Sequence, residues 1–215
     1  EKAGGNSQTA VGVASYADGE GSSAFGANAN ATGSTATAIG RATKAIAQSA
    51  SAFGDSASAS SWGATALGVG ASARADNSIA VGSAAVTEGR ESTALGRRSY
   101  AGAQSATALG TLANASAIVS TAVGNDAKAS AIQASALGNG AEASGGSSMA
   151  LGAKARASGS DALASGSNAS ASSDNAIAIG KDSQSSAINA IAMGESSNAS
   201  AVSAIVIGTQ AKGTH

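Results

Sequence analysis

The sequence predicts an all-β parallel solenoid built from about fifteen coils of 14 residues. Three observations predict it. More than half of the 215 residues are Ala, Ser or Gly (58, 38 and 29), a Gly recurs every 14 residues from Gly12 to Gly208, and small and larger side chains alternate between these glycines. Alternation with a period of two is typical of β-strands. Repetition at a fixed period indicates identical units stacked on one another.

The first strand of each coil directly precedes the repeated Gly, which we number position 0. Position −2 is Ala in every repeat except the last, where it is Val206, and position −1 is large and apolar in every repeat except at Ser165. Leu163, on the same strand face, is expected to compensate for this serine. A coiled coil could also repeat every 14 residues, but Gly in each repeat and the lack of a Leu/Ile seam exclude it.

The second strand follows the Gly turn. Positions +3, +5 and +7 are nearly all Ala, Ser, Thr or Gly, whereas +4 and +6 are mostly polar, as in Asn30, Lys44 and Arg156. We therefore expect the small faces of the two strands to meet inside a thin roll and the polar face to contact water. A second turn, often with Gly or Ser, closes the coil.

The large apolar residues at position −1 are then expected on the outside of the first strand. A row of fifteen coils at ~4.8 Å per coil is a longer apolar stripe than a soluble monomer exposes. We expect copies of the chain to associate through it in a cyclic arrangement. The interface residues predicted in this way are Phe25, Ile39, Phe53, Leu67, Val81, Leu95, Leu109, Val123, Leu137, Leu151, Ile179, Met193 and Ile207.

Composition excludes several classes of protein. A net charge of −1 does not indicate a surface for nucleic acid. The sequence contains no run of 18 apolar residues, so no membrane-spanning helix is expected. The absence of Cys excludes disulfides and thiolate metal sites, so no metal or cofactor is expected. The sole His is the last residue, His215, which argues against an enzyme. The first residues do not resemble a signal peptide, so any export signal is expected outside these 215 residues.

Other repeat proteins fit less well. Hexapeptide-repeat acyltransferases need a six-residue period, of which 14 is not a multiple. Calcium-binding nonapeptide solenoids need Asp in every coil, whereas Asp18, Asp55 and Asp126 fall at different positions. Four Asn-Ala-Ser/Thr triplets match the N-glycosylation sequon and begin at Asn30, Asn114, Asn168 and Asn198. The repetition itself explains their presence.

Exposed aromatic and arginine side chains are the candidate ligand-binding residues, because these types dominate interface energies. Tyr16 and Tyr100 are both at position +4 and Trp62 is in a second turn at +8. Arg97 and Arg98 share one first turn and are candidates for an acidic partner or a glycan. The alternatives are that the aromatics pack on a neighbouring coil and that the Arg pair is a solvated turn.

Two further groups lie at defined positions. Ile118, Ile132, Ile188 and Val202 share position +8 and are expected to seal a subunit edge, with an exposed ligand patch as the alternative. Residues 14 apart are expected to pair between coils, which places opposite charges side by side. The expected neighbours are Lys128, Glu142 and Arg156 in one ladder, Arg74 with Glu88, and Asp76 with Arg90.

Three repeats carry a recognisable motif: Asn77-Ser78-Ile79-Ala80-Val81-Gly82, and its equivalents at 175–180 and 189–194. From residue 7 to 215 the repeats resemble the N-S-V-A-I-G head repeats of the YadA-like trimeric autotransporter adhesins. The resemblance implies a left-handed parallel β-roll and a homotrimer. It also implies an exported protein at the outer membrane and cell surface of a bacterium, which contributes to virulence by binding host cells or extracellular matrix.

The family's neck, coiled-coil stalk and membrane anchor are not recognised, so residues 1–215 are expected to form a single repeat domain. Membrane attachment would come only from a C-terminal anchor outside this fragment. The chain departs from the family motif where position −3 is Thr rather than Val, as at Thr37, Thr65, Thr93, Thr107 and Thr121.

Two functions other than adhesion stay open. The Thr residues at −3 resemble the flat arrays of ice-binding solenoids, but their companion position −1 is Val, Leu or Phe, and −3 itself becomes apolar from Met149 onward. A passive spacer in a surface fibre is the other alternative.

Overall fold

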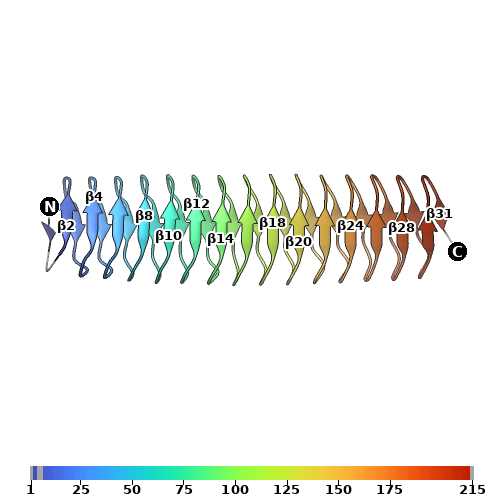
Figure 1. Cartoon of the computed structure of the whole chain (residues 1–215), viewed down its shortest axis with the longest axis horizontal. Coiled ribbons are helices and arrows are strands. Elements are labelled where there is room, and N and C mark those ends of the chain that lie inside the picture. The colour runs from blue at the N-terminus through green and yellow to red at the C-terminus, as the bar shows by residue number, and fades with distance from the viewer. Residues whose placement is uncertain (1, 4–6, 214–215) are drawn as a thin grey trace. The chain divides into compact units, whose positions relative to one another are not determined.

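The computed structural model describes residues 2–3 and 7–213 and contains β-strands and turns but no helix in that part of the chain. Contacts divide the chain into two compact units, Glu1–Ala106 and Thr107–His215. Both are parallel β-solenoids with a 14-residue coil, as predicted: Ala66 pairs with Ala80 and Ala122 with Ala136. Figure 1 shows the parallel strand arrows of successive coils within each unit. The expectation of a single domain stays a prediction.

Each coil contributes one three-residue strand and one two-residue strand. We call the even-numbered, three-residue strands of each unit its B sheet and the odd-numbered, two-residue strands its A sheet. In Glu1–Ala106 the B sheet comprises β2 (Thr9–Val11), β4 (Ser23–Phe25), β6 (Thr37–Ile39), β8 (Ser51–Phe53), β10 (Thr65–Leu67), β12 (Ile79–Val81) and β14 (Thr93–Leu95). Its A sheet comprises β1 (Lys2–Ala3), β3 (Tyr16–Ala17), β5 (Asn30–Ala31), β7 (Lys44–Ala45), β9 (Ser58–Ala59), β11 (Ser72–Ala73), β13 (Val86–Thr87) and β15 (Tyr100–Ala101).

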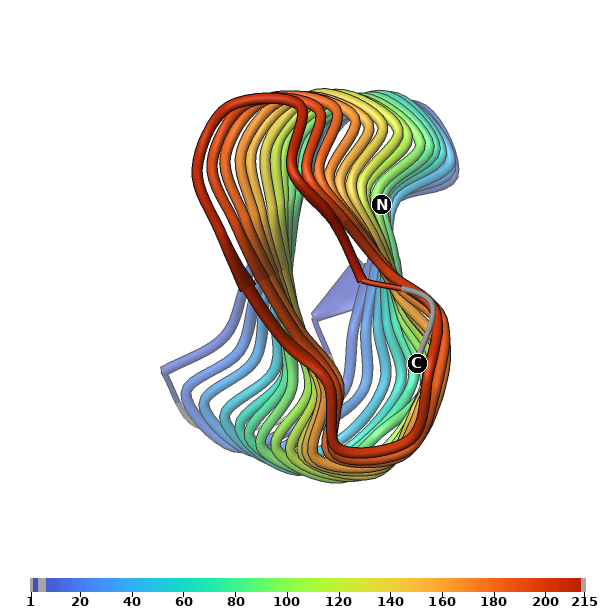
Figure 2. The same ribbon diagram turned by 90° about the vertical axis from the view of Figure 1, so that its right-hand side faces the viewer.

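The unit Thr107–His215 is built in the same way. Its B sheet comprises β16 (Thr107–Leu109), β18 (Thr121–Val123), β20 (Ser135–Leu137), β22 (Met149–Leu151), β24 (Leu163–Ser165), β26 (Ile177–Ile179), β28 (Ile191–Met193) and β30 (Ile205–Ile207). Its A sheet comprises β17 (Asn114–Ala115), β19 (Lys128–Ala129), β21 (Glu142–Ala143), β23 (Arg156–Ala157), β25 (Ser170–Ala171), β27 (Gln184–Ser185), β29 (Asn198–Ala199) and β31 (Lys212–Gly213). Viewed end-on, each coil passes once around the roll, with a turn at either end (Figure 2).

The interior of the roll consists mainly of alanine, with some serine and threonine. Positions −4, −2, +3 and +5 are buried except in the end coils, and Ala64, Ala66, Ala71 and Ala73 of one coil have no exposed surface. This is the interior that the alternation predicted. An Ala side chain has no rotamers to lose on folding, so a core of this kind costs little side-chain entropy. An alanine core also buries little apolar area per residue. The parallel backbone hydrogen bonds between coils therefore do much to order the fold.

Several buried serines in this interior donate to carbonyl oxygens of the turns, whereas the hydroxyls of Ser22 and Ser148 have no hydrogen-bond partner among the described residues. Ser15 Oγ donates to the Gly12 carbonyl oxygen at 2.8 Å, and Ser99 Oγ donates to that of Gly96 at 2.9 Å. In the second turns, Ser92 Oγ donates to the Gly89 carbonyl oxygen at 2.6 Å. A buried hydroxyl without a partner would be destabilising. At these three positions the carbonyl oxygen three residues earlier accepts both the backbone N–H and the hydroxyl of the serine.

Both turns place a residue in the left-handed region, at positions +2 and +9. Most of these residues are not Gly: Arg98 has φ 55° and the β-branched Val119 has φ 56°. The repeated Gly at position 0 is different. Gly68 has φ 131°, and a Cβ there would lie 2.7 Å from the Gly82 carbonyl oxygen. This close approach of two backbones explains the invariant Gly spacing in the chain.

Two of the expected charge ladders differ from the structure. Arg74 pairs with Glu88 at 2.6 Å and Arg156 with Glu142 at 2.7 Å, as predicted. Lys128 is in register with Glu142, but its Nζ lies 3.5 Å from Asp126 Oδ1 in its own coil. Asp76 and Arg90 lie in register in neighbouring coils, since the Glu91 N–H donates to the Asp76 carbonyl oxygen at 2.9 Å, but their side chains bind other partners. Asp76 Oδ1 accepts a hydrogen bond from the Trp62 backbone N–H, and Arg90 lies 3.5 Å from Glu91.

Candidate binding surface

The described residues enclose no pocket and include no group of three or more potential metal ligands. They contain no helical segment with the length and apolarity that a membrane crossing requires. The candidate binding surfaces in this part of the chain are the outer faces of the roll. Each unit has two such faces, one on the B sheet and one on the A sheet.

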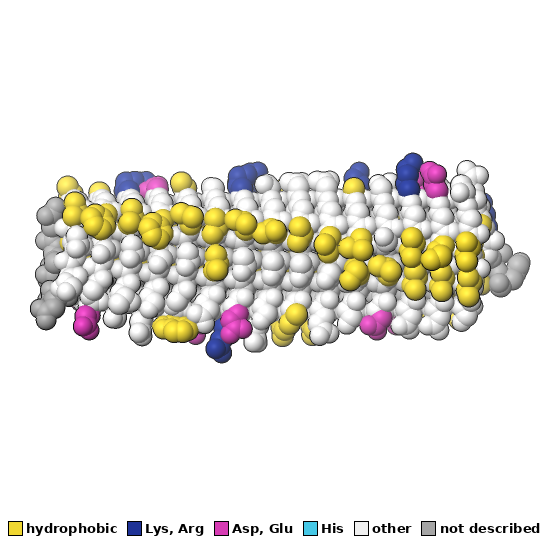
Figure 3. All heavy atoms as spheres, viewed as in Figure 1, with side chains coloured by type: hydrophobic (Ala, Val, Ile, Leu, Met, Phe, Trp, Pro, Cys, Tyr) yellow, Lys and Arg dark blue, Asp and Glu magenta, His cyan; other side chains and the backbone are white. Residues whose placement is uncertain are grey.

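The outer face of the B sheet carries the apolar row predicted at position −1. Figure 3 shows hydrophobic side chains following one another along each unit. Leu67 is 47% exposed, Leu95 44% and Leu109 36%. The residues of the predicted interface that are exposed in the single chain are Phe25, Ile39, Leu67, Leu95, Leu109, Leu137, Met193 and Ile207. The remaining ones, Phe53, Val81, Val123, Leu151 and Ile179, are partly exposed.

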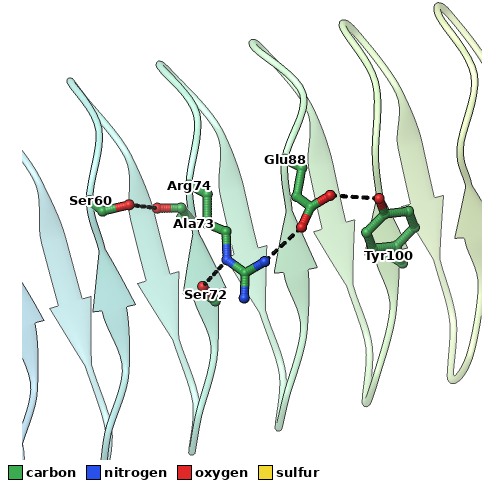
Figure 4. Close-up of polar contacts among 6 residues, drawn as sticks. All are labelled: Ser60, Ser72, Ala73, Arg74, Glu88 and Tyr100. Atoms are coloured by element: carbon green, nitrogen blue, oxygen red, sulfur yellow. Dashed lines mark hydrogen bonds and ion pairs between the residues drawn. The ribbon is translucent and has the colours of Figure 1, made fainter.

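The outer face of the A sheet carries the polar positions +4 and +6. Its most connected part is a chain of three side chains in Glu1–Ala106 (Figure 4). Glu88 accepts from Arg74 Nη1 at 2.6 Å through Oε1 and from the Tyr100 hydroxyl at 2.7 Å through Oε2. Arg74 Nε also donates to Ser72 Oγ at 3.0 Å. The network therefore fixes side chains from three consecutive coils against the sheet.

Gly102 explains the position of the Tyr100 ring. Positions +4 and +6 point to the same side of a strand, and Gly102 is at +6 in the coil of Tyr100. A Cβ at Gly102 would lie 2.5 Å from Tyr100 Cε1 and 2.7 Å from Cζ. The ring thus occupies the space that a side chain at +6 takes in other coils. This allows its hydroxyl to reach Glu88 of the preceding coil (Figure 4).

The network shifts the pKa of both acidic partners. The hydrogen bond from Tyr100, followed by that from Arg74, lowers the pKa of Glu88 from its ordinary value. The hydrogen bond to Glu88 and partial burial raise the pKa of Tyr100. Both shifts favour the same state, in which Glu88 is ionised and Tyr100 is protonated. The network therefore persists across neutral pH.

The other candidate residues lie elsewhere. Tyr16 is equivalent to Tyr100 at +4, but its hydroxyl bonds to Asp18 of its own coil, which raises the pKa of Tyr16. Trp62 is 51% exposed in a second turn. Arg97 and Arg98 are exposed in the first turn that leads into Tyr100. The structure thus places Tyr100, Arg97 and Arg98 in one coil, with Tyr16 and Trp62 on other coils of the same unit.

Sequence reasoning missed Gly102 as a functional residue. It also treated Arg74 and Glu88 only as a charge ladder, although they hold Tyr100 in place. One signal was available: Gly102 is the only Gly at position +6, where most coils have Ser. Gly102 lies in one of the two coils that carry a Tyr at position +4.

These features define a class of protein: a parallel β-solenoid with an alanine interior, an apolar outer face and a polar outer face. The family model for the YadA head domain repeat matches the chain in overlapping segments that together cover residues 9–43, 63–183 and 185–211. The chain therefore belongs to the family of YadA head domain repeats.

One solved structure that matches is the crystal structure of the collagen-binding domain of the Yersinia adhesin YadA. It is 22% identical to this chain, with a TM-score of 0.36, and the match covers 74% of this chain and 80% of that one. Among curated protein sequences, none matches this chain.

Proposed function

We propose that this chain is the head of a bacterial surface adhesin, exported to the outer membrane and active as a homotrimer. Its polar A-sheet faces and turns would bind host cells or extracellular matrix. The observation that carries the proposal is the apolar row along the B sheet, in a chain that belongs to the YadA head repeat family. Association of three copies through that row covers it and leaves the A-sheet faces outward.

Trimer formation also suits a protein whose surface lacks pockets. A flat face offers each ligand few contacts, so the affinity of one site is weak. Three symmetric copies raise the effective concentration and thereby the avidity, without new contacts. The matching Yersinia domain is a collagen-binding domain, so collagen is among the matrix proteins to test.

The test is attachment of beads coated with the 215-residue chain to collagen, other matrix proteins and cultured cells. Replacing Tyr16, Trp62, Arg97, Arg98 and Tyr100 together by Ser should reduce attachment and leave the oligomer intact. The matched control replaces five other outward residues, Lys44, Lys128, Arg156, Gln184 and Asn198, by Ser. Attachment that is equal for the wild type and the first variant would remove the five candidates from the site.

Absence of attachment by the wild type to every surface would instead favour the spacer function. The ice-binding alternative is tested separately by thermal hysteresis, which an adhesin head does not produce. A positive hysteresis together with no attachment would overturn the adhesin proposal.

A further inference from the structure

Arg97 and Arg98 are two adjacent cations without an ion-pair partner in the described part of the chain. The other four arginines all have one: Arg41 with Asp55 at 2.8 Å, Arg74 with Glu88, Arg90 with Glu91, and Arg156 with Glu142. The comparison with Arg41 is the closest, because Arg41 and Arg97 are both at position +1 of a first turn. At Arg97 and Arg98 the compensating carboxylate is missing, so their charge is available to an anionic ligand.

The turn that carries this pair is held in place. The Arg98 backbone N–H donates to the Ser83 carbonyl oxygen at 2.9 Å, and the Ser99 N–H donates to that of Gly96 at 3.2 Å. The two guanidinium groups therefore start from a fixed backbone. Arginine donors in such a setting suit a carboxylate or sulfate group, which accepts two parallel hydrogen bonds.

Two residues further along the same coil, Tyr100 provides an aromatic surface. Its ring lies over Gly102, and its hydroxyl is bound to Glu88, which is bound to Arg74. Because this network fixes the ring, a ligand that stacks on it pays little ordering entropy. The face of an aromatic ring is electronegative and attracts C–H groups that carry partial positive charge. A pyranose ring presents such C–H groups on one side and hydroxyls around its edge.

We propose that Tyr100, Arg97 and Arg98 form a binding site for an acidic saccharide. One sugar ring stacks on Tyr100, and a carboxylate or sulfate of the same oligosaccharide binds Arg97 and Arg98. The guanidinium N–H groups of Arg74 that Glu88 and Ser72 leave unused donate to sugar hydroxyls. This proposal rests on the proposed function, because it names the class of ligand that the outward face would bind.

A peptide fits this surface less well than a saccharide. Peptides bound to sheets or aromatic grooves rely on pockets for their side chains, and the described residues enclose none. The saccharide needs only a flat ring and donors beside it, which this coil supplies.

The experiment titrates the 215-residue chain with a heparin-derived hexasaccharide, which carries sulfates and carboxylates, and measures affinity by calorimetry. Hyaluronan hexasaccharide, which carries carboxylates only, separates the two acidic groups. A neutral chito-hexasaccharide controls for stacking alone, and inorganic hexapolyphosphate, an anion without rings, controls for charge alone. We expect binding of at least one acidic saccharide and at least tenfold weaker binding of both controls.

The decisive variant is Gly102→Ser, which introduces the residue that eight coils carry at this position and changes no charge. It displaces the ring, and we expect affinity to fall about tenfold, as for Tyr100→Ser, because an aromatic contact is lost. Arg97→Gln combined with Arg98→Gln should also weaken binding about tenfold or more. Arg41→Gln, at the equivalent position +1 of another first turn, is the matched control and should leave affinity unchanged.

Two results overturn the proposal. If Gly102→Ser and Tyr100→Ser bind as the wild type does, or hexapolyphosphate binds equally well, the site attracts anions only by charge. If no saccharide binds the wild type, there is no such site. Neither result affects the adhesin function, which fails only if coated beads attach to nothing.

Discussion

The two units have the same interior and differ in what they carry outside. In Glu1–Ala106 position +6 varies and includes Asp18, Ile46, Arg74 and Glu88, whereas in Thr107–His215 it is Ser in all seven coils from Ser116 to Ser200. Position −3 also differs between the two units. It is Ser or Thr at six of seven coils in the first unit, and apolar from Met149 to Ile205 in the second.

This difference shows that fold and surface are specified by separate positions. The buried positions and the repeated Gly are nearly invariant along the chain, so each unit forms the same coil. The outward positions +4 and +6 do not line the interior, and their residues vary from coil to coil. The first unit carries the charged residues of position +6 on its A-sheet face, and the second carries additional apolar residues at position −3 on its B-sheet face.

The largest expected effect tests whether the apolar row has the same role in both units. Burying a Leu side chain contributes about 1.5–3 kcal/mol, and a trimer changes three copies at once. Leu67→Asp in the first unit and Leu109→Asp in the second should each dissociate or unfold the proposed trimer, as measured by native mass spectrometry and circular dichroism. Ser130→Asp, on the A-sheet face, is the control and should leave the trimer intact. A wild-type monomer at micromolar concentration would contradict the assembly.

The next effect tests whether the first turns of both units are equally tight. Gly68→Ala brings a Cβ within 2.7 Å of the Gly82 carbonyl oxygen, whereas a Cβ at Gly70, with φ 65°, has no neighbour within 4 Å. In the second unit, Gly138 and Gly140 form the equivalent pair. We expect position 0 to cost several times more than position +2, where alanine costs about 1–2 kcal/mol for its left-handed conformation. Thermal unfolding measures both, and equal losses at the two positions would refute the explanation of the Gly spacing.

Exchanging residues at position −3 should sharpen the contrast between the units. Ile191→Thr removes apolar surface from the second unit and should cost about 1 kcal/mol per chain. Thr65→Ile adds such surface to the first unit and should raise the melting temperature of the assembly. If Thr65→Ile lowers the melting temperature, the Thr side chains of the first unit make polar contacts at the interface, which is then not purely apolar.

The smallest effect concerns pH and the Tyr100 network. Because the folded pKa of Glu88 is lowered, its contribution is present above its ordinary value of 4.5 and is lost as pH falls through the folded value. Because the pKa of Tyr100 is raised, its contribution is present below 10.0 and is lost as pH rises through the folded value. Between these two pH limits, Tyr100→Phe should therefore lower the free energy of unfolding by ~0–1 kcal/mol, the value of an exposed contact. The melting temperature should fall slightly as a result. A difference that persists at pH 3 would contradict this origin.

The sequence predicts the interior of this molecule well because one rule decides it. Alternation and the Gly spacing assign Ala80 to the core and Val81 to the outside, and the structure agrees. The details that it does not predict depend on side-chain geometry. The Asp76 carboxylate binds a backbone N–H instead of Arg90, and Tyr100 bends over Gly102 to reach a neighbouring coil. Pairing at a distance of 14 residues indicates which side chains are neighbours, but not which of several partners each one binds.

The alanine interior has a consequence for how such chains change over time. Conventional cores fit together only in one arrangement, so a piece of chain rarely exchanges with another. Here each coil presents the same small side chains and the same glycine to its neighbours. Recombination between any two equivalent positions therefore yields a chain that is still in register, shorter or longer by whole multiples of fourteen codons. The number of coils, and with it the number of outward sites, can change by genetic duplication or loss without any redesign of the core.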